Sequence, residues 1–185
     1  MDVFIPIVFP DYKISAFDTK WSNLGHAGIL FLLGKTGATK YYEYGRYDAA
    51  GLGLVRKLLI PDAKVSKNGI LDQTSLKPVL KSIAKQSGQG TRISGAYIEQ
   101  SNGYQKAFDF VEGQKKQNTN TKRKAYGLTD NNCGTFMQET LDAAGVDTPW
   151  MLDPRPNSYI EELREKFRDL DYDPNSDTLT IANSP

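Results

Sequence analysis

Apolar residues in the first half of the chain are grouped in short β-prone runs bounded by glycine, proline and polar residues. The run Gly25–Leu33 is almost continuously apolar, which indicates a central strand covered on both faces. Gly34–Gly37 is a turn, so the aromatic run Lys40–Tyr47 forms a hairpin with that strand. Pro6 lacks a backbone donor and places the first run at a sheet edge or a bulge. The predicted strands are 3–9, 25–33, 40–47, 53–60 and 92–99.

Later segments follow the helical period, with apolar residues three and four positions apart. The predicted helices start at Thr74 or Ser75 (ending at Gly88 and Gly90), at Asn102, at Cys133 and at Asn157 (ending near Arg168). The segment from Asp169 is acidic and weakly patterned, and we expect a frayed tail. Together these elements predict an α+β fold with a mainly antiparallel sheet packed against helices. We expect one catalytic domain over 1–185, with a core of about 3–168 and a tail of 169–185.

Composition narrows the possible functions. The 185 residues carry a net charge of +1 with 24% charged residues, so nothing indicates a nucleic-acid partner. One cysteine and one histidine exclude an internal disulfide and the common zinc sites, and we expect no metal and no cofactor. The longest apolar run is too short to cross a bilayer and the N-terminus lacks a basic signal region. We therefore expect synthesis in the cytoplasm, no secretory signal and no stable membrane insertion.

The single cysteine, Cys133, lies where a polar loop turns into a helix. Asp130, Asn131 and Asn132 all favour helix N-caps, and the cysteine follows them directly. Unpaired N–H groups and the helix dipole in the first turn favour a thiolate, which is the nucleophilic form. The alternative is structural: Cys133 also lies on the apolar stripe of its helix, where a cysteine acts as a small buried hydrophobe.

A cysteine nucleophile needs a base, and the chain offers only His26. If Leu33 and Lys40 flank the hairpin turn, His26 pairs near Gly45 to Arg46, and Glu43 or Tyr44 lies one step along the partner strand. Register decides which of the two faces the imidazole, since a slip of one residue exchanges the faces. We favour Glu43, because a carboxylate orients the ring and stabilises the imidazolium. The alternatives are a structural histidine and a solvent-facing glutamate.

These residues resemble a known family. The order of His26-Ala-Gly-Ile-Leu, Tyr42-Glu43-Tyr44 and Asn132-Cys133-Gly-Thr-Phe136 is similar to that of circularly permuted papain-like hydrolases of the NlpC type. The resemblance implies that Cys133 is the nucleophile, His26 the base and Glu43 the residue that orients the ring. Related acyltransferases carry Glu-His after the cysteine, whereas Gly134-Thr135 stands here, which weakens the acyltransferase and isopeptidase interpretations.

The wider context, with Tyr41–Tyr47, Asn131–Phe136 and Thr148-Pro-Trp150, resembles small bacterial effectors that cleave peptidoglycan and are delivered by type VI secretion. This resemblance implies export without a signal peptide, action in the periplasm of a rival cell, and a cognate immunity protein. The expected reaction is hydrolysis of a stem-peptide amide or crosslink.

Four further residues are candidates for the site by position. The Cys133 backbone N–H and the Asn132 side chain are candidate oxyanion donors. Tyr44, Arg46 and Trp150 are candidate cleft residues; packing of the two aromatic residues and a surface charge for the arginine are the alternatives. Two other functions stay open: a lipid acyltransferase or thioesterase on the same triad, and an inactive binding module of the same fold.

Overall fold

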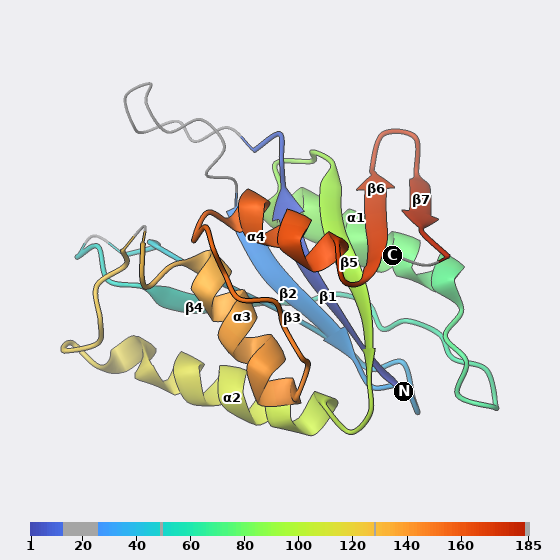
Figure 1. The fold of residues 1–185 in the computed structure, drawn as a ribbon, viewed down its shortest axis with the longest axis horizontal. Helices are drawn as coiled ribbons and strands as arrows, with labels where there is room; N and C mark the ends of the chain where they lie inside the picture. The colour runs from blue at the N-terminus through green and yellow to red at the C-terminus, as the bar shows by residue number, and fades with distance from the viewer. Residues whose placement is uncertain (13–25, 49, 128, 184–185) are drawn as a thin grey trace.

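A computed structural model describes residues 1–12, 26–48, 50–127 and 129–183. These residues form a seven-stranded antiparallel sheet in the order β4-β3-β2-β1-β5-β6-β7 (Figure 1). The strands are β1 (Asp2–Phe9), β2 (His26–Leu32), β3 (Thr39–Gly45), β4 (Leu54–Leu58), β5 (Ile93–Gln100), β6 (Arg168–Asp173) and β7 (Thr178–Ile181). The helices are α1 (Leu76–Ser87), α2 (Tyr104–Lys116), α3 (Cys133–Ala144) and α4 (Pro156–Arg164), with short 3-10 turns at Gln73–Ser75 and Gln117–Thr119. The predicted α+β class is confirmed.

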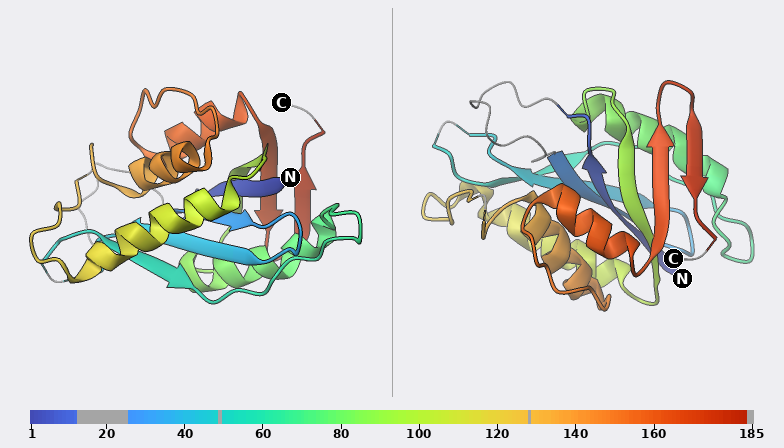
Figure 2. Two further views of the ribbon diagram at one scale, coloured as in Figure 1. Left: turned by 90° about the horizontal axis from the view of Figure 1, so that it is seen from below. Right: turned by 45° about the horizontal axis from the view of Figure 1, so that its top comes forward.

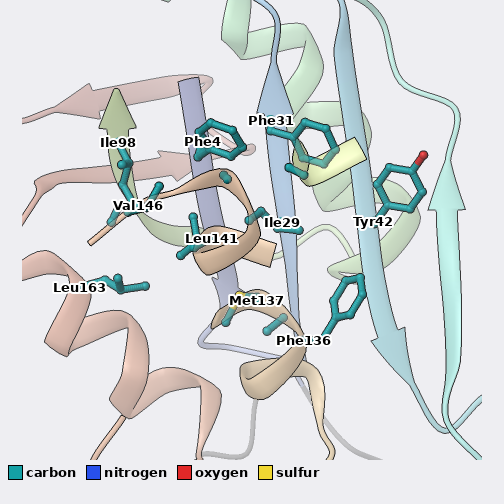
Figure 3. Packing of buried hydrophobic residues seen from close by; sticks show 14 of the residues in the cluster. Phe4, Ile29, Phe31, Tyr42, Ile98, Phe136, Met137, Leu141, Val146 and Leu163 are labelled. Carbon is teal, nitrogen blue, oxygen red and sulfur yellow. The ribbon is translucent and has the colours of Figure 1, made fainter. Parts of the chain in front are cut away.

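The sheet separates two hydrophobic cores. Helices α2, α3 and α4 cover one face and α1 covers the other, as Figure 2 shows. Side chains alternate along β2, so Ile29 and Phe31 pack toward α3 while Leu30 and Leu32 pack toward α1. Figure 3 shows the first of these cores, where Phe136 and the residues that follow it in α3 lie against β2 and β3. The continuous apolar pattern of the β2 segment therefore reflects burial on both faces, as predicted.

The first strand departs from its predicted position. β1 lies in the middle of the sheet, between β2 and β5, so the prediction that Pro6 places this strand at an edge was wrong. Its pairing with β2 is continuous, whereas the pairing with β5 passes from Phe4↔Ile98 to Ile7↔Gly95 without a pair at Pro6. The missing N–H of Pro6 thus interrupts only the ladder with β5. The strand can therefore lie in the middle of the sheet.

The C-terminal segment also differs from its prediction. The segment expected to be a weakly patterned tail forms β6 and β7, and β6 pairs with β5 from Ile93↔Tyr172 to Tyr97↔Arg168. Leu170 and Tyr172 are buried in the α1-side core. Helix α4 is correspondingly shorter than predicted. It begins at Pro156 with Arg155 as N-cap, because a proline suits the first helical position, and it ends at Arg164.

The predicted hairpin is confirmed. β2 and β3 pair from Leu32↔Thr39 to Gly28↔Glu43. The same register, extended by two residues, sets His26 opposite Gly45, as the turn at Gly34–Gly37 predicted. Gly25, the predicted start of the first of these strands, lies outside the described residues. None of the helices formed by the described residues has the length and hydrophobicity that a membrane crossing requires.

The burial of Leu170 makes the C-terminal strands part of the folding unit. Replacing Leu170 by Ala should lower the free energy of unfolding by about 2–4 kcal/mol, since it leaves a cavity in the core. Urea denaturation followed by circular dichroism measures the change. Thr180→Ala, on the exposed edge strand β7, is the matched control and should change stability by less than about 0.5 kcal/mol. Equal effects of the two substitutions would contradict this packing.

Candidate active site

The start of α3 is fixed by a reciprocal cap. The Asn132 side-chain oxygen accepts hydrogen bonds from the backbone N–H groups of Gly134 (2.7 Å) and Thr135 (3.1 Å). In return the Thr135 hydroxyl accepts from the Asn132 N–H at 2.9 Å. This capping box satisfies donors that would otherwise be unpaired, and it makes Cys133 the first residue of the helix, as predicted.

The thiol of Cys133 is enclosed. The residue is 3% exposed, its Sγ lies 3.7 Å from the Tyr126 hydroxyl, and the backbone N–H of Ala27 is directed at it. Burial raises the pKa of the thiol, although the Tyr126 hydroxyl and nearby backbone N–H groups act in the opposite direction. The N–H groups of the helix terminus thus favour the thiolate, as predicted, but burial outweighs them. The resting form is a buried thiol that requires a base.

The imidazole of His26 is held by Glu43. His26 Nε2 lies 2.7 Å from Glu43 Oε2 and 3.1 Å from the Tyr47 hydroxyl. The ring stacks on Phe9, with centroids 5.9 Å apart, and Tyr12 lies against it at 5.5 Å. Both hydrogen bonds that the described residues make to the ring use Nε2. Nδ1 is therefore the nitrogen that faces no described hydrogen-bond partner and is available to a thiol or a substrate.

Glu43 is the most enclosed charged group of the site, with no exposed surface. Its Oε2 accepts hydrogen bonds from His26, from the Tyr41 hydroxyl at 3.3 Å and from the Ser87 hydroxyl of α1. Its Oε1 lies 3.0 Å from Nε of Arg56, a charge contact that lacks the alignment of a hydrogen bond. Burial alone would raise the pKa of this carboxyl, but His26, Ser87 and Arg56 together hold it below its ordinary value. Glu43 is thus a buried carboxylate.

The nucleophile candidate and the base candidate lie near the start of β2, on opposite faces of the sheet. Alternation directs His26 and Glu43 toward the α1 side, and Cys133 packs with Ala27 on the α3 side. The charges of both Glu43 and Cys133 act on Tyr47. Burial raises the pKa of Tyr47 well above the ordinary value, and these two charges add to that rise. The described contacts include no hydrogen bond between Cys133 and His26. The two are neighbours through Ala27, and proton transfer requires Nδ1 to approach Sγ.

The remaining predicted residues have mixed positions. The Asn132 amide is buried and engaged at both ends, because its Nδ2 donates to the Pro154 carbonyl at 3.2 Å. Tyr44 stacks between Tyr126 and Phe136 and accepts a hydrogen bond from Asn131 at 2.8 Å. These contacts are those of packing residues for both Asn132 and Tyr44. Arg46 is exposed, and Trp150 is 82% exposed on the loop between α3 and α4. The structure therefore pairs His26 with Glu43, places Cys133 beside Ala27, the residue that follows His26, and leaves Trp150 exposed.

Sequence reasoning missed the groups that surround the pair. These are Tyr41, Tyr47, Arg56, Ser87 and Tyr126. Period-2 alternation could have identified Tyr41, which shares a strand face with Glu43. The pairing Glu43↔Arg56 could have identified Arg56 only with the β3–β4 register known. Ser87 arrives from a helix far along the chain and has no local signal.

A cleft of about 830 Å³ is lined by residues of α4 and of strands β5, β6 and β7. Its lining includes cations and carboxylates, among them Arg92, Arg155 and Asp171. One end adjoins the candidate site, since Val8 in the lining pairs with Ala27, which contacts the thiol. Among the described residues no group of three or more histidine, cysteine, aspartate or glutamate side chains is arranged to hold a metal ion.

The fold and the site together define a class. A strand-borne His–Glu pair precedes a helix-start cysteine, on an antiparallel sheet covered by helices, which is the order expected of permuted papain-like proteins. The family model described as type VI secretion system effector TseH-like matches residues 4–148, and the chain belongs to this family.

The crystal structure of the type VI secretion system effector TseH superposes with a TM-score of 0.87, at 37% identity over 98% of both chains. None of the curated proteins compared with the chain matched it significantly.

The enclosed thiol predicts a specific labelling profile. Cys133 in native protein should react with iodoacetamide at higher pH than the same cysteine in urea-denatured protein, because burial raises the pKa of the thiol. Tyr126→Phe should move the native profile further upward, because it removes a hydrogen bond to the thiolate. Mass spectrometry of labelling from about pH 6 to 10 measures both. A native profile at lower pH than the denatured one would contradict the burial argument.

The lowered pKa of Glu43 predicts that its contribution to the free energy of unfolding depends on pH in the acid range. Its pKa is lowered in the folded state, so its contribution is complete above the ordinary value of 4.5 and is lost as pH falls through the lower folded value. Glu43→Gln should cost about 2–3 kcal/mol at pH 7. The difference in free energy of unfolding between wild type and Glu43→Gln should become smaller below about pH 4. Urea denaturation at several pH values measures it, and a difference that widens toward acid pH would refute the assignment.

Proposed function

We propose that the protein is an antibacterial cysteine hydrolase that cleaves amide bonds in the stem peptides of bacterial peptidoglycan. The observation that carries the proposal is the His26–Glu43 hydrogen bond of 2.7 Å at the start of β2, next along the strand to Ala27, whose backbone N–H is directed at the helix-start Cys133. Membership of a type VI secretion effector family supports a target outside the producing cell. The protein is made in the cytoplasm of the producer and acts in the periplasm of the target cell.

The proposed reaction begins with proton transfer from Cys133 to Nδ1 of His26. The thiolate attacks the carbonyl carbon of the amide, and the Cys133 backbone N–H at the helix terminus stabilises the oxyanion. The imidazolium then protonates the departing amine, leaving an acyl-thioester on Cys133. Water, deprotonated by His26, hydrolyses the thioester and releases the carboxylic acid. Glu43 keeps its charge throughout and stabilises the imidazolium, as the hydrogen bond to Nε2 allows.

The oxyanion role assigned to Asn132 by position is weaker than that of the backbone. Its carboxamide caps α3 through Oδ1 and holds Pro154 through Nδ2. To serve as an oxyanion donor it would have to release Pro154. We therefore assign the main role to the Cys133 N–H and regard the Asn132 side chain as the group that orients it.

The substrate is expected to lie in the cleft between α4 and β5–β7. The cleft adjoins the Cys133 end of α3, because the Pro154 carbonyl contacts Asn132 directly before Arg155 enters the lining. Its side chains carry charges of both signs, which complements the amines and carboxylates of a stem peptide. Exposed Arg46 and Trp150 are candidates for contacts with the outer parts of the substrate. A cognate immunity protein is the expected partner, since peptidoglycan of the producer offers the same bonds.

Digestion of purified peptidoglycan tests the proposal. Wild-type protein should release new stem-peptide fragments, whereas Cys133→Ala and His26→Ala should release fewer by a factor of at least about 10³. Liquid chromatography with mass spectrometry identifies the fragments and the bond. The same fragments from Cys133→Ala would contradict the assigned nucleophile, and no cleavage by any of the three proteins would contradict the cell-wall substrate.

Thermal unfolding of the same three proteins is the control. Cys133→Ala should melt within a few degrees of wild type if the thiol serves chemistry, whereas His26→Ala should melt lower because it removes a partner of the buried Glu43 carboxylate. A severe fall in melting temperature for Cys133→Ala, without any activity in wild type, would instead support a cysteine that is only part of the core.

A further inference from the structure

Arg56 contacts the buried carboxylate of the site from the neighbouring strand. It lies on β4 directly opposite Glu43 on β3. Its Nε is 3.0 Å from Oε1 of Glu43, and its side chain is 42% exposed while that of Glu43 has no exposed surface. One partly solvated cation therefore faces the carboxylate oxygen that does not bind His26. The carboxylate and guanidinium together carry no net charge.

Arg56 also contacts Tyr47, the second residue that lies at hydrogen-bond distance from Nε2 of His26. Its guanidinium lies over the Tyr47 ring, 4.6 Å from the centroid, at cation–π distance. The Tyr47 hydroxyl in turn lies 3.1 Å from Nε2 of His26. Arg56 thus touches both Glu43 and Tyr47, the two described residues that hydrogen bond to the histidine ring. The charge of Arg56 therefore influences His26 through Glu43 and Tyr47, without direct contact with the ring.

This arrangement has a consequence for the proton on His26. An uncompensated buried carboxylate beside an imidazole favours imidazolium, which cannot accept a proton from a thiol. The thiol here is enclosed and burial raises its pKa, so it is not the source of a thiolate that would balance an imidazolium. Base catalysis at neutral pH therefore needs a carboxylate that orients the ring without keeping it protonated.

We propose that Arg56 is a positioning residue that balances the charge of Glu43, so that Glu43 orients His26 with less tendency to hold a proton on it, and that fixes Tyr47 on Nε2. This inference rests on the proposed function for its catalytic meaning. Among the described residues, the charged or titratable side chains around His26 and Glu43 are Tyr12 after β1, Tyr41 and Tyr47 from β3 and the residues after it, Arg56 from β4 and Cys133 from α3. Arg56 is the cation that contacts Glu43 among them.

The single histidine of the chain makes a direct test possible. The ring carbon–proton signal of His26 in a ¹H–¹³C NMR titration reports protonation of that imidazole alone. Arg56→Gln should raise the midpoint of protonation by roughly 0.5–1 pH unit, because the Glu43 charge is no longer balanced. Arg56→Met retains the apolar stem over Tyr47 and should give the same upward shift, which keeps the test available if the glutamine variant is unstable.

Lys57→Gln is the matched control. Lys57 is the next residue of β4, carries the same charge and faces the other side of the sheet, where it lies over the Tyr42 and Phe108 rings and 3.6 Å from Glu112. Its removal should leave the His26 midpoint unchanged within about 0.2 pH unit, because the lost charge does not contact Glu43. Arg56→Lys, which keeps a cation at the position, should return the midpoint toward that of wild type.

Activity on purified peptidoglycan gives the second measurement. The acid limb of the kcat/KM profile should move to higher pH in Arg56→Gln, and much of the rate lost at pH 6 should return at pH 8. A uniform loss at every pH with an unmoved His26 midpoint would overturn the proposal and leave a purely structural role for Arg56. Inactive wild type would contradict the proposed function alone, since the NMR midpoints decide the charge-balancing role independently.

Discussion

The arrangement of the site follows from the burial of one charge, the carboxylate of Glu43. A fully enclosed carboxylate is costly unless donors and an opposite charge surround it, and here the partners come from four different elements. His26 is on β2, Tyr41 on β3 itself, Arg56 on β4 and Ser87 at the end of α1. The carboxylate is thus satisfied only when three strands and a helix on one face of the sheet are in place. Folding and assembly of the site are therefore coupled.

The groups of the candidate site are distributed over both faces of the sheet. The α1 side holds the orienting carboxylate and the imidazole, and the α3 side brings the cysteine with a preformed helix terminus. His26 and Ala27, adjacent at the start of β2, connect the two sides, because the backbone N–H of Ala27 is directed at the Cys133 thiol. Cys133 is enclosed, with Tyr126 on its sulfur, so in the proposed reaction the imidazole and a substrate must reach a thiol that the resting fold protects. A secreted effector gains from such protection, because an exposed thiolate is easily oxidised.

Local rules predicted the parts of the site that local sequence determines. The turn at Gly34–Gly37 fixed the register that sets Glu43 beside His26, and the polar residues before Cys133 fixed the start of α3. Longer-range features were beyond such rules. Ser87 and Arg56 reach Glu43 through tertiary packing and strand order, which no pattern in their own segments reveals. The same limit explains Pro6, whose central strand lacks pairs with β5 at residues 5 and 6, and the C-terminal strands, which join the sheet through the pairing of β6 with the distant β5. The enclosure of the thiol, too, depends on Tyr126 and Ala27 together and not on the helix terminus.

In the proposed mechanism Cys133 attacks substrate with His26 as its base. The most direct measurement is intact-protein mass spectrometry of wild-type protein mixed with stem peptide and quenched in acid within the first turnovers. Because the chain has one thiol, an acyl-thioester can form at only one cysteine. The account predicts an adduct with the mass of the acyl half of the cleaved peptide, located on Cys133 by fragmentation and absent in Cys133→Ala. Cleavage of the peptide without any adduct on Cys133, under conditions that preserve thioesters, would contradict it.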